Sequence, residues 1–150
     1  MKIYEGRIVY NLIAQGKQAS LDTPAEVAKY LTGAFNDHPL QEQLIVIPLN
    51  RRNQPYGRFR ITIGIAHSAP IHPREAFQAA IPAGANSLIL SHNHPSGNPE
   101  PSHQDIKITR RLADAGKILG IELIEHIIMG DIEDDPHGLG YYSFNEAGLL

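Results

Sequence analysis

Short apolar runs alternate with segments of helical spacing along this chain, and this order predicts strands interleaved with helices. Predicted strands cover residues 3–13, 44–49, 58–65, 87–94, 121–129 and 141–144. Predicted helices cover residues 23–35, 72–80 and 102–119. A polar turn separates the strands at 44–49 and 58–65, so we expect them to pair as a hairpin. The pattern predicts an α/β (α+β) fold in which helices pack against a mixed sheet.

Local capping signals support the predicted helices. Thr23, Pro24 and Glu26 form a capping-box sequence with proline in the first turn. Pro73 takes the corresponding place in the second helix. The third helix is expected to end at Gly120, because glycine accepts the left-handed conformation that often closes a helix.

Composition narrows the functional classes. The chain has 150 residues, 42% hydrophobic and 19% charged, as in an ordinary globular domain. It lacks cysteine, which excludes disulfides, thiolate zinc sites and thiol nucleophiles. Without a run of about eighteen apolar residues or a signal-peptide pattern, we expect a soluble, cytoplasmic protein with no membrane partner. The net charge of -3 gives no general reason to bind nucleic acid. The local exceptions, Arg51-Arg52, Arg58-x-Arg60 and Arg110-Arg111, are expected to form solvated faces.

A metal site is predicted between the strand at 87–94 and the helix at 102–119. His92 and His94 point to the same face if the strand continues through them, because strand side chains alternate. Prolines and a glycine then turn the chain, and Ser102 followed by Asp105 begins the helix. The Asp105 carboxylate can therefore face the two imidazoles. Two nitrogens and one oxygen leave a fourth tetrahedral position open for water, as in catalytic zinc sites.

Each half of this pattern has a simpler explanation by itself. A His-x-His pair is more often a surface or hydrogen-bonded core feature than a ligand pair. A Ser-x-x-Asp sequence is usually a helix cap. The conjunction of the two favours the metal site. The tripeptide His92-Asn93-His94 is no evidence for an HNH nuclease, because that name refers to residues far apart in sequence.

The spacing of this site resembles a known signature. His92-x-His94, seven residues, Ser102, two residues and Asp105 resemble the JAMM signature of the JAB/MPN+ metalloprotease superfamily. The strings His92-Asn93-His94-Pro95-Ser96-Gly97, Pro101-Ser102 and His72-Pro73-Arg74-Glu75, with residues 121–130 and 142–150, resemble its RadC branch. The resemblance implies a RadC-like JAB (MPN+) domain over residues 23–150, after an N-terminal strand or extension at 1–22. It also implies a JAB-type mixed sheet flanked by helices, with a cytidine-deaminase-like architecture.

The resemblance also implies catalytic roles. JAMM proteins carry an essential glutamate where a helix passes into the first core strand, and Glu42 fits that position; by pattern alone it is an ordinary exposed glutamate. Such a carboxylate takes a proton from the attacking water and returns it to the leaving amine. Glu26 has a capping role, and Glu75, at the start of the next helix, is the second candidate. The resemblance assigns Ser102 to the oxyanion, while its alternative role as a helix cap stays open.

Five further polar residues have open roles. His67 and His72 are candidates for a fourth ligand, but a third imidazole would close the site and displace the water, which favours a supporting role. The RadC pattern usually has Asp-His where this chain has Glu125-His126, so Glu125 is a departure. A buried, hydrogen-bonded pair is favoured there over a ligand pair. The pattern indicates no role for Arg74.

We expect a zinc-dependent hydrolase, a metallopeptidase or isopeptidase, in which His92, His94 and Asp105 hold Zn²⁺. Its substrate would be a peptide, an isopeptide or another amide. The alternative, from another class, is a DNA-repair-associated accessory or binding module with a non-catalytic metal. Full-length RadC proteins typically have a helix-hairpin-helix region, and the segment before Thr23 is expected to be too short for one. Neither the physiological substrate nor the oligomeric state follows from the sequence.

Overall fold

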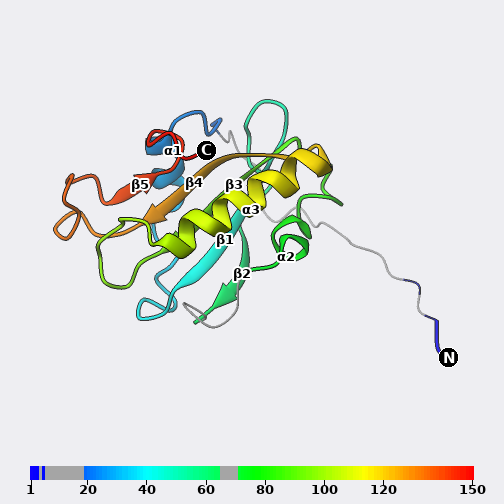
Figure 1. The fold of residues 1–150 in the computed structure, drawn as a ribbon, viewed down its shortest axis with the longest axis horizontal. Helices are drawn as coiled ribbons and strands as arrows, with labels where there is room; N and C mark the ends of the chain where they lie inside the picture. The colour runs from blue at the N-terminus through cyan, green and yellow to red at the C-terminus, as the bar shows by residue number, and fades with distance from the viewer. Residues whose placement is uncertain (4, 6–18, 65–70) are drawn as a thin grey trace.

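The computed structural model describes residues 1–3, 5, 19–64 and 71–150. Its strands are β1 (Gln43–Leu49), β2 (Phe59–Ile63), β3 (Ser87–Asn93), β4 (Glu122–Met129) and β5 (Tyr141–Ser143). Its helices are α1 (Pro24–Tyr30), α2 (Pro73–Phe77) and α3 (His103–Leu119). The strands form a five-stranded sheet in the order β2-β1-β3-β4-β5 (Figure 1).

The sheet is mixed, which confirms the predicted fold class. β1 pairs antiparallel with both β2 and β3, so the predicted hairpin is also present. β3 and β4 run parallel, and β5 returns antiparallel to β4. A parallel pair needs a long crossover connection, and α3 provides it by passing over one face of the sheet (Figure 1).

Two predicted helices end earlier than the sequence pattern suggests. After α1 the chain tightens into three-residue turns: the Thr32 N–H donates to the Lys29 carbonyl at 3.2 Å, and Gly33 adopts a φ of 74°. After α2 the Ala80 N–H likewise donates to the Phe77 carbonyl at 3.1 Å. The predicted strand at 3–13 falls largely outside the described residues.

Apolar side chains cover both faces of the sheet. On one face, Phe77 of α2 and Leu112 of α3 belong to the same buried cluster as Leu88 and Leu90 of β3. On the other face, α1 contributes to a second buried cluster, with Val27 and Leu31 packed with Ile45, Ile47 and Ile89. All seven residues of β3 are buried. Side chains of β3 therefore enter the core on both faces of the sheet. The polar residues at the end of β3 are held in place by this central, buried strand.

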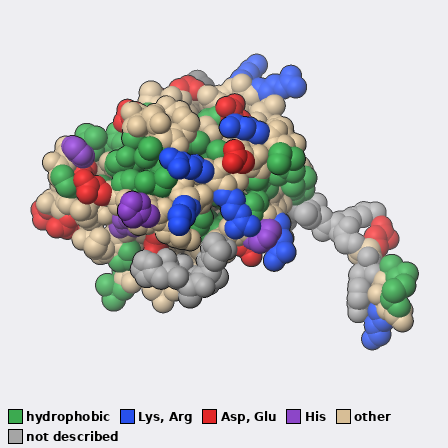
Figure 2. Space-filling view, viewed as in Figure 1, with side chains coloured by type: hydrophobic (Ala, Val, Ile, Leu, Met, Phe, Trp, Pro, Cys, Tyr) green, Lys and Arg blue, Asp and Glu red, His purple; other side chains and the backbone are tan. Residues whose placement is uncertain are grey.

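The outer face of α3 is basic. Figure 2 shows Lys and Arg side chains gathered on the face where α3 lies in Figure 1. The exposed basic residues of this helix are Lys107, Arg110, Arg111 and Lys117. The exposure of Arg110 and Arg111 agrees with the predicted solvated face. No helix among the described residues combines the length and the apolar character needed to cross a bilayer.

The contact between α3 and β4 depends on Gly116. A Cβ atom at this position would lie 2.5 Å from the Ile121 carbonyl oxygen. Replacing glycine by alanine within a helix normally stabilises a protein. Here the added methyl group would clash with backbone, so we expect the substitution to be destabilising. We predict that Gly116→Ala lowers the free energy of unfolding by about 1–3 kcal/mol in urea denaturation. Asp114→Ala, at an exposed site of the same helix, is the control and should change little. Unchanged or increased stability of Gly116→Ala would contradict the close contact.

Candidate metal centre

Four side chains meet where β3 ends. His92 lies near the end of β3 and His94 directly follows that strand, while Asp105 lies in the first turn of α3 and Glu42 directly precedes β1. Their ligand atoms all lie within 4.8 Å of one another. Because Leu44 lies opposite His92 in the antiparallel β1–β3 pair, position 42 is brought beside position 94. The structure thus brings together the three predicted ligands and the glutamate chosen by resemblance.

The distances within this group suit a metal ion. His92 Nε2 lies 3.0 Å from His94 Nε2, 3.2 Å from Asp105 Oδ1 and 3.6 Å from Glu42 Oε1. His94 Nε2 lies 3.5 Å from Asp105 Oδ2. Two imidazole nitrogens and two carboxylates, directed at one point from different elements, form a donor set that divalent transition metals accept. These residues therefore fit a metal ion.

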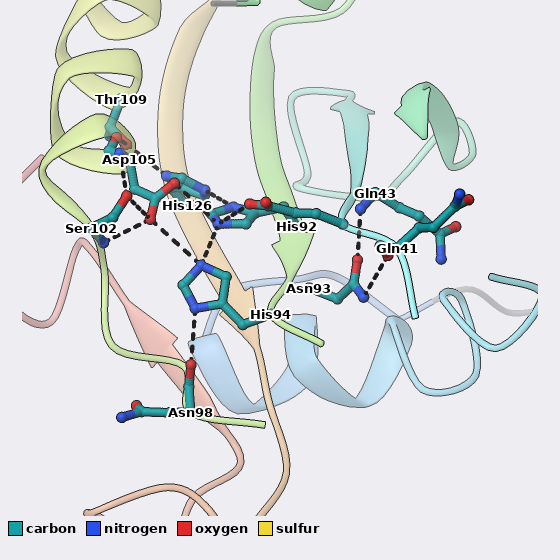
Figure 3. A network of polar contacts seen from close by, with 11 residues as sticks. Gln41, Gln43, His92, Asn93, His94, Asn98, Ser102, Asp105, Thr109 and His126 are labelled. Atoms are coloured by element: carbon teal, nitrogen blue, oxygen red, sulfur yellow. Dashed lines mark hydrogen bonds and ion pairs between the residues drawn. The ribbon is translucent and has the colours of Figure 1, made fainter. Parts of the chain in front are cut away.

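His94 is oriented by the loop that follows it. Its Nδ1 lies 2.9 Å from the Asn98 carbonyl oxygen. Figure 3 shows this contact as a dashed line below the His94 ring. A carbonyl oxygen only accepts hydrogen bonds, so Nδ1 carries the proton and donates it. In the neutral ring, Nε2 then has its lone pair free to face the group. The backbone is held too, because the His94 N–H donates to the Met129 carbonyl at 2.9 Å.

Asp105 is held by the predicted capping box. Ser102 Oγ accepts from the Asp105 N–H at 3.1 Å, while Asp105 Oδ2 accepts from both the N–H and the hydroxyl of Ser102 at 2.7 Å. One carboxylate oxygen is thereby tied to the helix start, and the other, Oδ1, lies nearer His92. Ser102 is therefore a helix cap, and in this arrangement its hydroxyl proton is given to Asp105.

Charge coupling shifts the protonation of this group. Burial alone would raise the pKa of Asp105, but the neighbouring imidazoles of His92 and His94 and the hydrogen bond from Ser102 hold that pKa far below its usual range. Burial alone would lower the pKa of His94, but its bonds to Asp105 and the Asn98 carbonyl, with the negative charges of Asp105 and Glu42, raise it above 6.5. The metal-free group is thus an anionic carboxylate facing a readily protonated imidazole.

Asn93 anchors the segment that carries Glu42. Its Oδ1 accepts from the Gln43 N–H at 2.8 Å, and its Nδ2 donates to the Gln41 carbonyl at 3.1 Å (Figure 3). The Asn93 amide thus binds the backbone on both sides of Glu42 and fixes the position of that residue at the start of β1. The sequence pattern did not predict this role of Asn93. The only available signal was the position of Asn93 between the histidines, which sends its side chain to the opposite face.

A cleft of about 420 Å³ opens over the group. Its lining includes Leu40, Glu42, Gly64, Pro95, Ser102 and Gln104. A second cleft of about 380 Å³ lies beside it and shares His94 and Pro95. Glu42, with a side chain 22% exposed, can therefore contact both the metal position and a molecule in the first cleft.

The other candidate residues lie elsewhere. Glu75 accepts from the His72 N–H at 3.0 Å and Glu26 from the Thr23 N–H at 2.9 Å, so both carboxylates bind helix starts. Neither they nor His72 belong to the metal group found among the described residues. Arg74 is exposed, and His67 lies outside the described residues.

The structure confirms the predicted buried, hydrogen-bonded pair Glu125-His126 in β4. Glu125 and His126 are both buried, and Glu125 Oε1 accepts from the His126 N–H at 2.8 Å. Glu125 also accepts from the Ser143 hydroxyl at 2.8 Å and the Asn145 N–H at 3.2 Å, so it secures the C-terminal segment. Burial raises the pKa of Glu125 despite these bonds.

Comparison with known proteins identifies relatives along most of the chain. The model of a family described as RadC-like JAB domain matches residues 21–149. UPF0758 proteins of Desulfitobacterium hafniense, Rubrobacter xylanophilus and Chlorobium chlorochromatii are 44%, 40% and 43% identical to this chain over the matched residues. The matches cover 73%, 87% and 83% of this chain and 45%, 53% and 53% of the respective relatives. The chain thus spans about half the length of these relatives, and their names state no activity.

The raised pKa of His94 predicts competition between metal and protons. The metal-free group keeps a proton on His94 at a pH where an ordinary histidine has lost it, and a bound metal must displace that proton. The dissociation constant of a divalent metal should therefore fall as pH rises and level off above the pKa of His94. Competition titrations between about pH 5 and 8 measure this, with the competing chelator titrated alone as control. A dissociation constant that is flat over this range would contradict the coupling.

Proposed function

This chain belongs to the RadC-like JAB domain family, and on that premise we propose that it is a zinc-dependent hydrolase that cleaves an amide or isopeptide bond. The family and the four-residue group fit a metal-dependent hydrolase. The observation that carries the finer proposal is the position of Glu42, whose Oε1 lies 3.6 Å from His92 Nε2 at the wall of an open cleft. A carboxylate beside the ligands, in reach of solvent, is what metal-assisted hydrolysis requires.

We assign His92 Nε2, His94 Nε2 and the Asp105 carboxylate as the zinc ligands. Two imidazoles and one carboxylate are an established ligand set for catalytic zinc, whereas calcium and magnesium prefer oxygen ligands. When bound, zinc would supply a Lewis acid that lowers the pKa of the attacking water towards about 7. Burial of His92, at 3% exposure, and the capping box around Asp105 hold two of the three ligands before any ion arrives.

Glu42 is the general base and then the general acid. It takes a proton from the attacking water and returns it to the amine that leaves. Its carboxylate shares the cleft with the ligands, while Asn93 fixes the backbone on both sides of it. One carboxylate can serve both steps because Glu42 lines the cleft that would hold the scissile bond.

Ser102 is the donor to the oxyanion. Its hydroxyl lines the same cleft, within the hydrogen-bonded group of Asp105. To donate to the oxyanion, the hydroxyl must turn away from Asp105 Oδ2, while the Ser102 N–H keeps its own bond to that oxygen at 2.7 Å. The cap thus survives the change of hydroxyl partner. The substrate is a peptide, an isopeptide or another amide that the open cleft admits.

Removing a ligand should remove the zinc. We predict that protein purified without added metal contains near-stoichiometric zinc and that His92→Ala loses it, because two remaining ligands hold the ion poorly. Elemental analysis measures the content. His72→Ala, at an exposed histidine outside the group, is the matched control and should keep its zinc. Wild-type protein that takes up no zinc, even when it is offered, would refute the proposed function.

Replacing the base should separate binding from turnover. Glu42→Gln keeps the shape of the side chain and removes the basic oxygen, so zinc should remain while kcat falls about 100- to 10,000-fold. A panel of fluorogenic peptide and isopeptide substrates supplies the assay. Glu75→Gln makes the same chemical change at a helix-capping carboxylate and should keep full turnover. Full activity in Glu42→Gln would exclude Glu42 as the base.

A further inference from the structure

A third histidine lies directly behind His92. His126 of β4 is fully buried, and its Nε2 lies 2.9 Å from His92 Nδ1. Its other ring nitrogen, Nδ1, lies 2.6 Å from the hydroxyl of Thr109 in α3. Figure 3 shows the His126 ring between Thr109 and His92. Both nitrogens of this ring are therefore hydrogen-bonded, and neither is available as a metal ligand.

The direction of each hydrogen bond follows from the last acceptor. Thr109 Oγ1 lies 2.6 Å from the Asp105 carbonyl oxygen, which can only accept, so the hydroxyl proton points there. Thr109 Oγ1 then accepts from the His126 Nδ1–H. In a neutral His126 this leaves Nε2 as an acceptor, and the proton between the rings belongs to His92 Nδ1. His92 Nε2 consequently keeps its lone pair, which faces His94 and Asp105.

His126 also packs against the core. Its ring stacks on Phe144 with centroids 4.4 Å apart and an angle of 18° between the planes. Stacking on Phe144 requires a ring but no ring nitrogen. Packing therefore does not account for a residue that places two ring nitrogens in short hydrogen bonds within a fully buried site.

We propose that His126 is a positioning residue for the metal centre: held by Thr109, it keeps His92 in the tautomer that presents Nε2 to the ion. The Asn98 carbonyl fixes the tautomer of His94 in the same way. In both imidazoles, an acceptor at Nδ1 thus leaves Nε2 free to face the metal position. This inference rests on the proposed zinc site for its purpose, although the tautomer itself exists without metal.

Thr109 gives the cleanest test, because it touches neither the cleft nor a side-chain ligand atom. Thr109→Val keeps the shape and removes the acceptor of the His126 proton, whereas Thr109→Ser keeps the hydroxyl. Imidazole nitrogen NMR on the metal-free protein at mildly alkaline pH reads the tautomer of His92, and competition with a chromophoric chelator gives the dissociation constant for zinc. Wild type and Thr109→Ser should show His92 protonated on Nδ1. Thr109→Val should lose that single tautomer and bind zinc about 10- to 100-fold more weakly.

A second pair of variants separates positioning from packing. His126→Phe keeps a ring to stack on Phe144 but offers His92 no acceptor, whereas His126→Gln packs less well and supplies an amide oxygen. Positioning predicts tighter zinc binding in His126→Gln than in His126→Phe. Packing alone predicts the reverse order, with the higher thermal stability also in His126→Phe.

Three results would decide against one or other idea. Wild-type zinc affinity and tautomer in Thr109→Val, or tighter zinc binding in His126→Phe than in His126→Gln, would overturn the role of His126. A wild-type protein with His92 protonated on Nδ1 but without zinc binding would refute the zinc hydrolase. It would uphold the hydrogen bonds by which Thr109 and His126 set the tautomer of His92. The two failures are therefore distinguishable.

Discussion

The register of β3 between β1 and β4 is the constraint on which the rest of the structure depends. All seven residues of this strand are buried, so its alternation decides what each face of the sheet receives. His92 faces His126, while Asn93 faces the opposite side and binds the backbone around Glu42. A shift by one residue would exchange the two sets. Apolar packing thus specifies the register of a polar site.

That polar site tolerates burial because its partners are paired before any ligand arrives. Asp105 receives two hydrogen bonds from Ser102, and the far nitrogen of each imidazole has an acceptor or donor of its own. Buried polar groups are stable only when they are satisfied in this way, and a satisfied group is also a rigid one. The same bonds that lower the cost of burial therefore orient the atoms that face the cleft.

Local signals in the sequence predicted much of the fold and of the site. Period-two alternation placed His92 and His94 together, and a capping sequence placed Asp105 at a helix start, because both signals act within a few residues. Glu42 has no local signal, and only family resemblance selected it. The links from Asn93 to Gln43 and from His126 to His92 span 50 and 34 residues and depend on strand order. Helix ends were misjudged where α1 tightens into turns, which apolar spacing does not report.

The parallel pairing of β3 with β4 has a consequence during synthesis of the chain. All four members of the group precede residue 106, so they leave the ribosome before His126, whose ring is hydrogen-bonded to His92. A nascent chain of that length carries the donors but not the partner strand, and its His92 can hold its proton on either nitrogen. On the proposed role of His126, tight binding of an ion would require the completed sheet. The order of the residues along the chain would then place metal binding after β4 has been added beside β3.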